Sequence, residues 1–411
     1  MTTRTRWLAC LLVGGLFLAP AAARAQNIGH GEPTPDWDWP LPLMLDNKES
    51  GFYFAPEAIW WKIDNPLKDQ VIAFRGFIDI GGFTLQLPDD VQEGTTRIFG
   101  SGTPALRADD ASQENYQWGW RLTFGYRFRN DVAVEFVYWK LMENRAVAGA
   151  SIVPPGLRPD VDLADTFVTA PFFNFSPLFG GPQNDVDSTI ILPGTGIRVP
   201  GPPVPAFGVN NAADDMTIEF VQRTWSGEFN FRLPIHRDDC SRSYMLIGPR
   251  YLQVYERFRL RMVDLDINGE GSPLDTVFYV NEWENRFYGA QVGMGGDQYL
   301  GNGFAIGAEG RVGLFADVMK ANTKYERADH AAASQNWRKE LTAAPMFQGG
   351  LYLWWYPIEG IQVRLGYEVL GLFNVPRSNY PVDFNVGRLT PDYEEEFLWI
   401  HGGSIGVAFI F

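Results

Sequence analysis

Charged side chains recur at alternate positions within apolar segments, and this spacing is the first sign of chemistry in the sequence. In Gln117–Arg129, for example, Arg121 and Arg127 alternate with large aromatic residues. Other segments with the same alternation carry further charges on the face opposite their apolar residues. The candidate set is Arg121, Arg127, Glu135, Arg223, Glu228, Glu309, Arg311, Arg364 and Glu368. Rings of such charges around a water-filled passage set the selectivity of pores.

A second run of charges consists of Arg257, Arg259 and Arg261, which alternate with Phe258, Leu260 and Met262. If the apolar residues meet lipid, these arginines join the others on the inward face. The inward charges then have two readings: they line an open passage, or they pair across a closed interior filled by side chains. The residue pattern alone leaves both open.

One segment has the spacing of a calcium loop. Asp264, Asp266 and Asn268 precede Gly269, and Asp275 stands at the twelfth position, where glutamate is usual. Oxygen ligands at alternate positions around a glycine turn can wrap one Ca²⁺. The alternative is a solvated hairpin loop built on Asx turns. Calcium is the one cofactor that the sequence suggests.

The elements that must position these charges are strands. In Gln117–Arg129 one face carries Trp118, Trp120, Leu122, Phe124, Tyr126 and Phe128. A helix would scatter these residues around its circumference, whereas a strand places them together. Nine other segments predict strands. The ten are Gly51–Lys62, Gln117–Arg129, Asp131–Glu143, Thr217–Arg232, Ser243–Met262, Arg286–Gly296, Phe304–Val318, Ala344–Tyr356, Ile361–Phe373 and the C-terminal segment that ends at Phe411.

The connections between these strands alternate in length, with long loops at 63–116 and 144–216 and short turns between. This is the pattern of a transmembrane up-and-down antiparallel β-barrel with short periplasmic turns and long external loops. A sheet that crosses a bilayer must close into a barrel, because every backbone polar group in lipid must be paired within the protein. The sequence therefore predicts an all-β barrel of about ten strands over 51–411, or twelve if 71–87 also crosses.

The N-terminus predicts export. Arg4 and Arg6 precede an apolar stretch, and Ala23-Arg24-Ala25 has the form of a cleavage site, so residues 1–25 are expected to be a signal peptide. Residues 26–50 would be a periplasmic segment. The net charge of -15 disfavours nucleic acid as a partner, because phosphate contacts need a basic surface. We expect the cell outer membrane of a Gram-negative type as the location.

Several short segments resemble a known family, the putative beta-barrel porin family 7 of bacterial outer-membrane proteins. They are Phe54–Trp61, Arg121–Tyr126, Trp225–Arg232, Gly248–Leu252, Pro171–Asn174, Asn285–Gly293 and Gly366–Glu368. Pro249 departs from this resemblance, and a bulge or an edge-like site is expected there. Terminal Phe411 resembles the aromatic signal by which the barrel-assembly machinery recognises such chains. The resemblance implies a barrel of pore type with no catalytic residues.

The expected function is that of an outer-membrane porin or small passive channel in contact with outer-membrane lipid. A closed structural or adhesion barrel that displays its external loops is the second reading. A barrel hydrolase is the third, and it is disfavoured because only His330 lies in an external loop. We therefore expect no enzyme.

Overall fold

The computed structural model describes residues 50–79, 97–112, 115–152, 165–174, 209–237, 241–264, 276–330, 333–358 and 360–411, with four short strand segments between 185 and 205. The predicted signal peptide and the residues up to 49 lie outside these ranges. Within them, no helix is long and apolar enough to cross a membrane.

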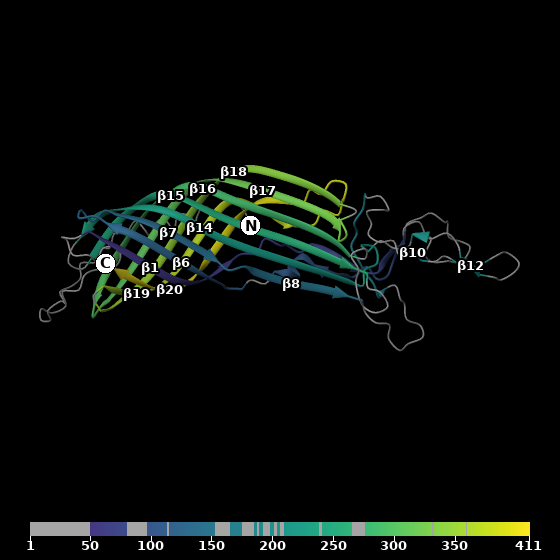
Figure 1. Ribbon diagram of the computed structural model, residues 1–411, viewed down its shortest axis with the longest axis horizontal. Helices are drawn as coiled ribbons and strands as arrows, with labels where there is room; N and C mark the ends of the chain where they lie inside the picture. The colour runs from purple at the N-terminus through teal and green to yellow at the C-terminus, as the bar shows by residue number, and fades with distance from the viewer. Residues whose placement is uncertain are drawn as a thin grey trace, which may run out of the picture.

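Ten antiparallel strands form a closed ring, so the predicted fold class is confirmed (Figure 1). Each strand pairs with the next along the ring, and the pairing of β14 with both β7 and β15 closes it. The strands are β1 (Gly51–Ile63), β6 (Gln117–Arg127), β7 (Ala133–Leu141), β14 (Asp215–Arg237), β15 (Ser241–Val263), β16 (Thr276–Gly301), β17 (Phe304–Arg327), β18 (Ala333–Ile358), β19 (Ile361–Tyr380) and β20 (Asp392–Ile410).

The wall continues into a segment that the sequence analysis assigned to a loop. β8 (Asn144–Ser151) follows β7 almost directly and pairs with the external half of β14, from Asp215 to Gln222. β7 pairs with the other half of β14, from Trp225 to Arg232. The expected loop over 144–216 is therefore wrong for its first eight residues, which extend the wall.

The twelve-strand alternative is also wrong. β2 (Val71–Arg75) pairs with β5 (Pro104–Arg107) and β9 (Val168–Thr169) in a small separate sheet, next to the 3-10 helix η2 (Ala108–Ala111). β3 (Phe77–Asp79) pairs with β4 (Arg97–Phe99). The remaining short strands are β10 (Asp185–Val186), β11 (Thr189–Ile191), β12 (Arg198–Pro200) and β13 (Val204–Pro205).

The two rims differ as predicted. The short connections at 128–132 and 302–303 lie at one rim, and the strand ends that flank the long intervals of the chain lie at the other. Asn302 has φ 53° and Gly303 φ 78°, the left-handed conformations of a tight turn. The C-terminus ends at the short-turn rim, opposite the end that carries β10 and β12 (Figure 1). Pro249 introduces no register shift between β14 and β15, so the expected bulge is absent there. Pro249 and Gly248 have no ladder partner on β14, which is the edge-like alternative.

Strands β14 to β20 are about twice as long as a bilayer crossing requires, whereas β1, β6 and β7 are about one crossing long. The outer face of the long strands changes character halfway. The outward residues of β17 are apolar from Phe304 to Val318, and then become polar with Lys320, Asn322, Lys324 and Glu326. On β16 the change falls between Tyr288 and Arg286. A transmembrane strand needs ~9–11 residues. The half near the short turns therefore spans the membrane, and the other half stands outside it.

The position of this apolar band is testable with Leu314, which points outward in the band and is 63% exposed. We expect Leu314→Arg to lower the free energy of unfolding from lipid vesicles by ~2–4 kcal/mol, because a charge would lie in hydrocarbon. Asn322→Arg, on the same strand above the band, should change it little. Equal effects of the two substitutions in a urea titration would place the band elsewhere.

Candidate functional site: the barrel interior

The interior of the membrane-spanning half holds a network of paired charges, which we call the charged layer. It consists of Arg121, Arg232, Arg250, Arg311 and Arg364 with Glu57, Glu135, Glu228, Glu309 and Glu368. Alternation along each strand brings them inward, because each stands between two outward apolar residues. Arginines and glutamates are equal in number, so the layer is close to neutral.

One branch of the charged layer is centred on Arg311. Its guanidinium contacts Glu228 and Glu309, each at 2.5 Å, and the three side chains are 9%, 2% and 4% exposed. Glu309 also contacts Arg232 at 3.1 Å, and Arg232 contacts Glu135 at 2.5 Å. Hydrogen bonds from Tyr53 to Glu135 and from Tyr244 to Glu309 fill further acceptor positions.

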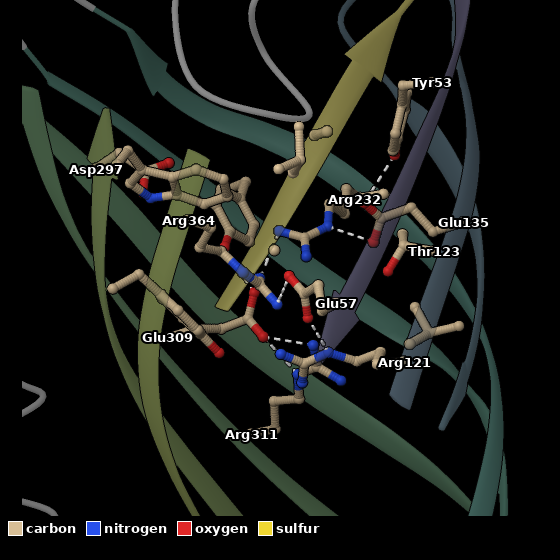
Figure 2. A pocket seen from close by; sticks show the side chains of 18 residues that line it. Tyr53, Glu57, Arg121, Thr123, Glu135, Arg232, Asp297, Glu309, Arg311 and Arg364 are labelled. Atoms are coloured by element: carbon tan, nitrogen blue, oxygen red, sulfur yellow. Dashed lines mark hydrogen bonds and ion pairs between the residues drawn. The ribbon is translucent and has the colours of Figure 1, made fainter. Parts of the chain in front are cut away.

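The other branch is centred on Glu57 of β1, which accepts from Arg121 and Arg364. Arg121 also contacts Glu368 at 2.6 Å. Gln348 joins the branches, because it accepts from Arg250 at 2.6 Å and donates to Glu368 at 3.0 Å. Figure 2 shows arginine and glutamate side chains from opposite parts of the wall converging on this region. The cavity left between them measures about 60 Å³, room for a few water molecules.

An apolar layer lies directly above the charged layer and closes the interior at mid-height. We call it the belt. Its members are Ile59, Trp61, Ile63, Trp139, Leu141, Leu252, Val254, Phe287, Phe315, Ala344, Met346, Leu370, Leu372, Val375, Leu398 and Ile400, all buried. Trp61 and Trp139 meet edge to face, with ring centroids 4.9 Å apart. Side chains from strands all around the ring thus meet in one packed layer.

A second polar cluster lies above the belt, around Arg377. Its guanidinium is fully buried and contacts Glu256 at 2.6 Å and Asp64 at 3.0 Å. Gln222 and Trp283 donate to Glu256 at 2.9 and 2.7 Å. Burial raises the pKa of Asp64, which follows the end of β1, against the opposing effect of Arg377. This cluster ties the external end of β19 to β14, β15 and β16.

The external half has an apolar interior of its own. Met216, Phe258, Leu260, Tyr279 and Tyr325 are among its buried residues. The loop segments pack into it, because Phe172 lies 5.6 Å from Tyr279 and 5.3 Å from Tyr325 between ring centroids. This half is therefore built like a soluble β protein, with an apolar inside and a charged outside.

Eight of the predicted lumen residues do face the interior. They are Arg121, Arg127, Glu135, Glu228, Glu309, Arg311, Arg364 and Glu368. Seven of them belong to the charged layer. Arg127 instead pairs with Asp131 at the short-turn rim.

The expectation for Arg257, Arg259 and Arg261 is corrected by the structure. They lie on the outer face of β15 in the external half, whereas Phe258, Leu260 and Met262 are buried inside. Arg257 pairs with Glu219, and Arg261 with Asp215. The prediction assumed that the apolar face of a strand meets lipid, which fails where the outside is water.

Arg223 is corrected for the same reason. It lies on the outer face of β14, is 51% exposed at its side chain, and pairs with Glu143 at 2.5 Å. Its neighbours Gln222 and Thr224 face the interior.

Several interior residues were missed by sequence reasoning, above all Glu57, Arg232, Arg250, Glu256 and Arg377. The signal for Arg232 was available, because it stands four residues from Glu228 on the same strand and so shares its face. Arg250 shares the face of Phe258, Leu260 and Met262, which the sequence analysis assigned to lipid. Arg377 could not be found this way, since β19 carries a register shift between Leu372 and Val375.

The predicted calcium loop falls mostly outside the described residues. Asp264 directly follows β15, and Asp266, Asn268 and Asp275 lie in 265–275, beyond the described ranges. Among the residues that are described, no three His, Cys, Asp or Glu side chains gather as a metal site. The calcium loop stays a prediction.

A family model described as putative beta barrel porin-7 matches residues 84–411. The chain belongs to this family. It is thus an outer-membrane β-barrel protein, and the resemblance found in its sequence is confirmed. No curated protein matches it.

Solved structures similar to the chain are outer-membrane barrels. The outer membrane protease OmpT from Escherichia coli is 6% identical with a TM-score of 0.37, over 88% of this chain and 96% of that one. A major outer membrane protein from Thermus thermophilus is 9% identical with a TM-score of 0.26, over 88% and 99%. A Pseudomonas aeruginosa FadL homologue is 9% identical with a TM-score of 0.26, over 90% and 91%. At such values these likenesses carry no argument about function.

The coupling within the charged layer is testable at Arg311. We expect Arg311→Met to lower the free energy of unfolding by ~3–5 kcal/mol, because Glu228 and Glu309 would keep buried charges without their shared partner. Arg338→Met, which breaks the more exposed pair with Glu340, should cost less than about 1 kcal/mol. Similar losses for both variants in vesicle-refolded protein would show that the layer is open to solvent.

Proposed function

We propose that this protein is a closed outer-membrane barrel, whose membrane-spanning half anchors a rigid external half at the cell surface. The observation that carries the proposal is the filled interior. The charged layer leaves about 60 Å³, and the belt packs side chains from around the ring above it. A passive pore needs a continuous path of water, and the small cavity together with the packed belt supports an interior without one.

The paired charges support the same conclusion. A selectivity ring presents charges to a passing solute, so its side chains keep exposed, unneutralised groups. Here the interior arginines contact one or two carboxylates each, and Arg250 is entirely buried. The charged layer therefore serves to fill and specify the interior, since burying unpaired charge is costly.

The external half is suited to present a surface. Its outer face carries both signs of charge, for example Arg257 beside Glu219 and Lys324 beside Glu326. The small sheet of β2, β5 and β9 and the residues around Phe172 cover its open end from inside the wall. Strands that run without interruption from the membrane into this half hold it in a fixed position.

The proposed role is not catalytic. The described histidines lie apart: His330 pairs with Glu326 in an exposed turn, His401 contacts Tyr367, and His236 stands at the short-turn end. A hydrolase site of the Asp/His or Ser/His type at the external rim would bring one of them together with a nucleophile or a carboxylate pair.

A passive channel is the second candidate, and the family description favours it. It requires the belt to move aside, after which the charged layer would line the passage. A channel of this kind predicts that Glu309→Gln shifts the ion selectivity of the conductance toward anions.

Planar-bilayer recording separates the two candidates. We expect folded protein, verified by its heat-modifiable migration in gels, to give no conductance steps under conditions where a known open porin inserts and conducts. Reproducible steps from the folded fraction would contradict the closed barrel and support the channel.

A further inference from the structure

The hydrogen-bond ladder between β18 and β19 stops partway along the two strands. The two strands pair from Ile358–Ile361 up to Met346–Leu372, and their pairing ends there. Beyond this point β18 continues to Ala333 and pairs only with β17. β19 turns toward the interior at Asn374, which has φ 56°, and it pairs onward with β20 alone. We call this interruption the seam.

The lower part of the seam lies at the height of the apolar band. Leu341, on the free edge of β18, pairs with Val318, which precedes the polar outward residues of β17. Leu341 points outward and is 71% exposed. Phe347, Phe373 and Phe397 cluster at the base of the seam, with ring centroids 4.9–6.0 Å apart. The seam therefore opens toward the outer leaflet, where unpaired backbone groups cost several kcal/mol each.

Directly behind the seam, the interior contains a carboxylate without a charged partner. Asp317 is fully buried on β17, and neither of its oxygens makes a side-chain hydrogen bond in the described chain. The backbone N–H of Arg286 is the donor that approaches it. Its cross-strand neighbours are the belt residue Phe287 and, on the free edge of β18, Thr342.

Two further acceptors without a partner adjoin Asp317. The Thr342 hydroxyl is buried and makes no hydrogen bond, and the same holds for Asn285 Oδ1, diagonal to Asp317 on β16. Opposite side chains on one face of an antiparallel pair have Cβ atoms ~4.5–5.5 Å apart, and diagonal ones ~7–8 Å. The three groups therefore form a small cluster of oxygen acceptors that includes one carboxyl group. Belt residues Phe287, Phe315 and Ala344 surround it.

We propose that this cluster binds the cationic head of an amphiphile that enters from the outer leaflet through the seam. The chemistry of the cluster selects the head, because oxygen acceptors beside a carboxylate match the N–H donors and charge of an alkylammonium group. The apolar surroundings select the tail, which can lie against the belt and the phenylalanines at the base of the seam. A carboxylate-headed lipid brings acceptors and no N–H donors, so it matches this cluster poorly.

The experiment uses the full chain in nanodiscs of zwitterionic phospholipid, with photoreactive diazirine analogues of dodecylamine and dodecanol as probes. We expect the amine probe to label peptides that contain residues 285–287, 315–319 or 342–346, as mapped by mass spectrometry. Asp317→Asn should reduce this labelling roughly tenfold or more, as expected for loss of a charge-assisted hydrogen bond. Labelling by the alcohol probe should change much less.

Glu282→Gln is the matched control, since Glu282 is an acid on the outer face of β16 in the external half. It should leave both probes unaffected. Thr342→Val should weaken amine labelling less than Asp317→Asn, because it removes a neutral acceptor. Unchanged amine labelling in Asp317→Asn, in protein shown to be folded, would overturn the proposal.

The route of entry is tested by competition. We expect unlabelled dodecylamine to compete with the probe, and water-soluble butylamine at the same concentration to compete poorly. Equal competition by butylamine would overturn entry from the leaflet and indicate a site for small cations from water. Neither result depends on whether the barrel conducts ions, so this test is independent of the proposed function.

Discussion

The pairing of backbone N–H and C=O groups in lipid is the constraint on which the rest of this structure depends. No water is available in hydrocarbon to satisfy these groups, so a β protein that crosses must close its sheet. Ten strands meet this requirement with an antiparallel ring through the apolar band, and the ring is interrupted at the seam. Strand β14 is long enough to pair with β7 and β8 in turn, which carries the wall past the break at Met142 and Glu143.

Closure with ten strands also decides what the interior contains. A ring of this size is narrow enough for side chains to reach one another across it. Charges that point inward must then pair, because an isolated buried charge is far more costly than a paired one. Arg311 forms ion pairs with two glutamates, and Glu57 forms ion pairs with two arginines. Above them lies the apolar belt, which separates the charged layer from the Arg377 cluster.

Sequence patterning predicted the ring well, because the period-two alternation of strands such as β6 and β17 is a direct consequence of lipid on one side. It underestimated their length. Arg286–Gly296 was expected where β16 covers Thr276–Gly301, since in the external half the alternation is inverted and less regular. The same inversion explains the misplaced Arg257, Arg259 and Arg261. Which arginine pairs with which glutamate depends on strand register, and no local pattern contains that information.

The central claim is that the interior is packed at the belt, and the accessibility of a cysteine placed there tests it most directly. Ala344 is fully buried in the belt, whereas Gln335 on the same strand is exposed. In a chain whose Cys240 is replaced by serine, Ala344→Cys should resist a charged methanethiosulfonate reagent until the protein is unfolded. Gln335→Cys should react at once. Rapid modification of Ala344→Cys in the folded protein would show that water reaches the belt, and would contradict a closed interior.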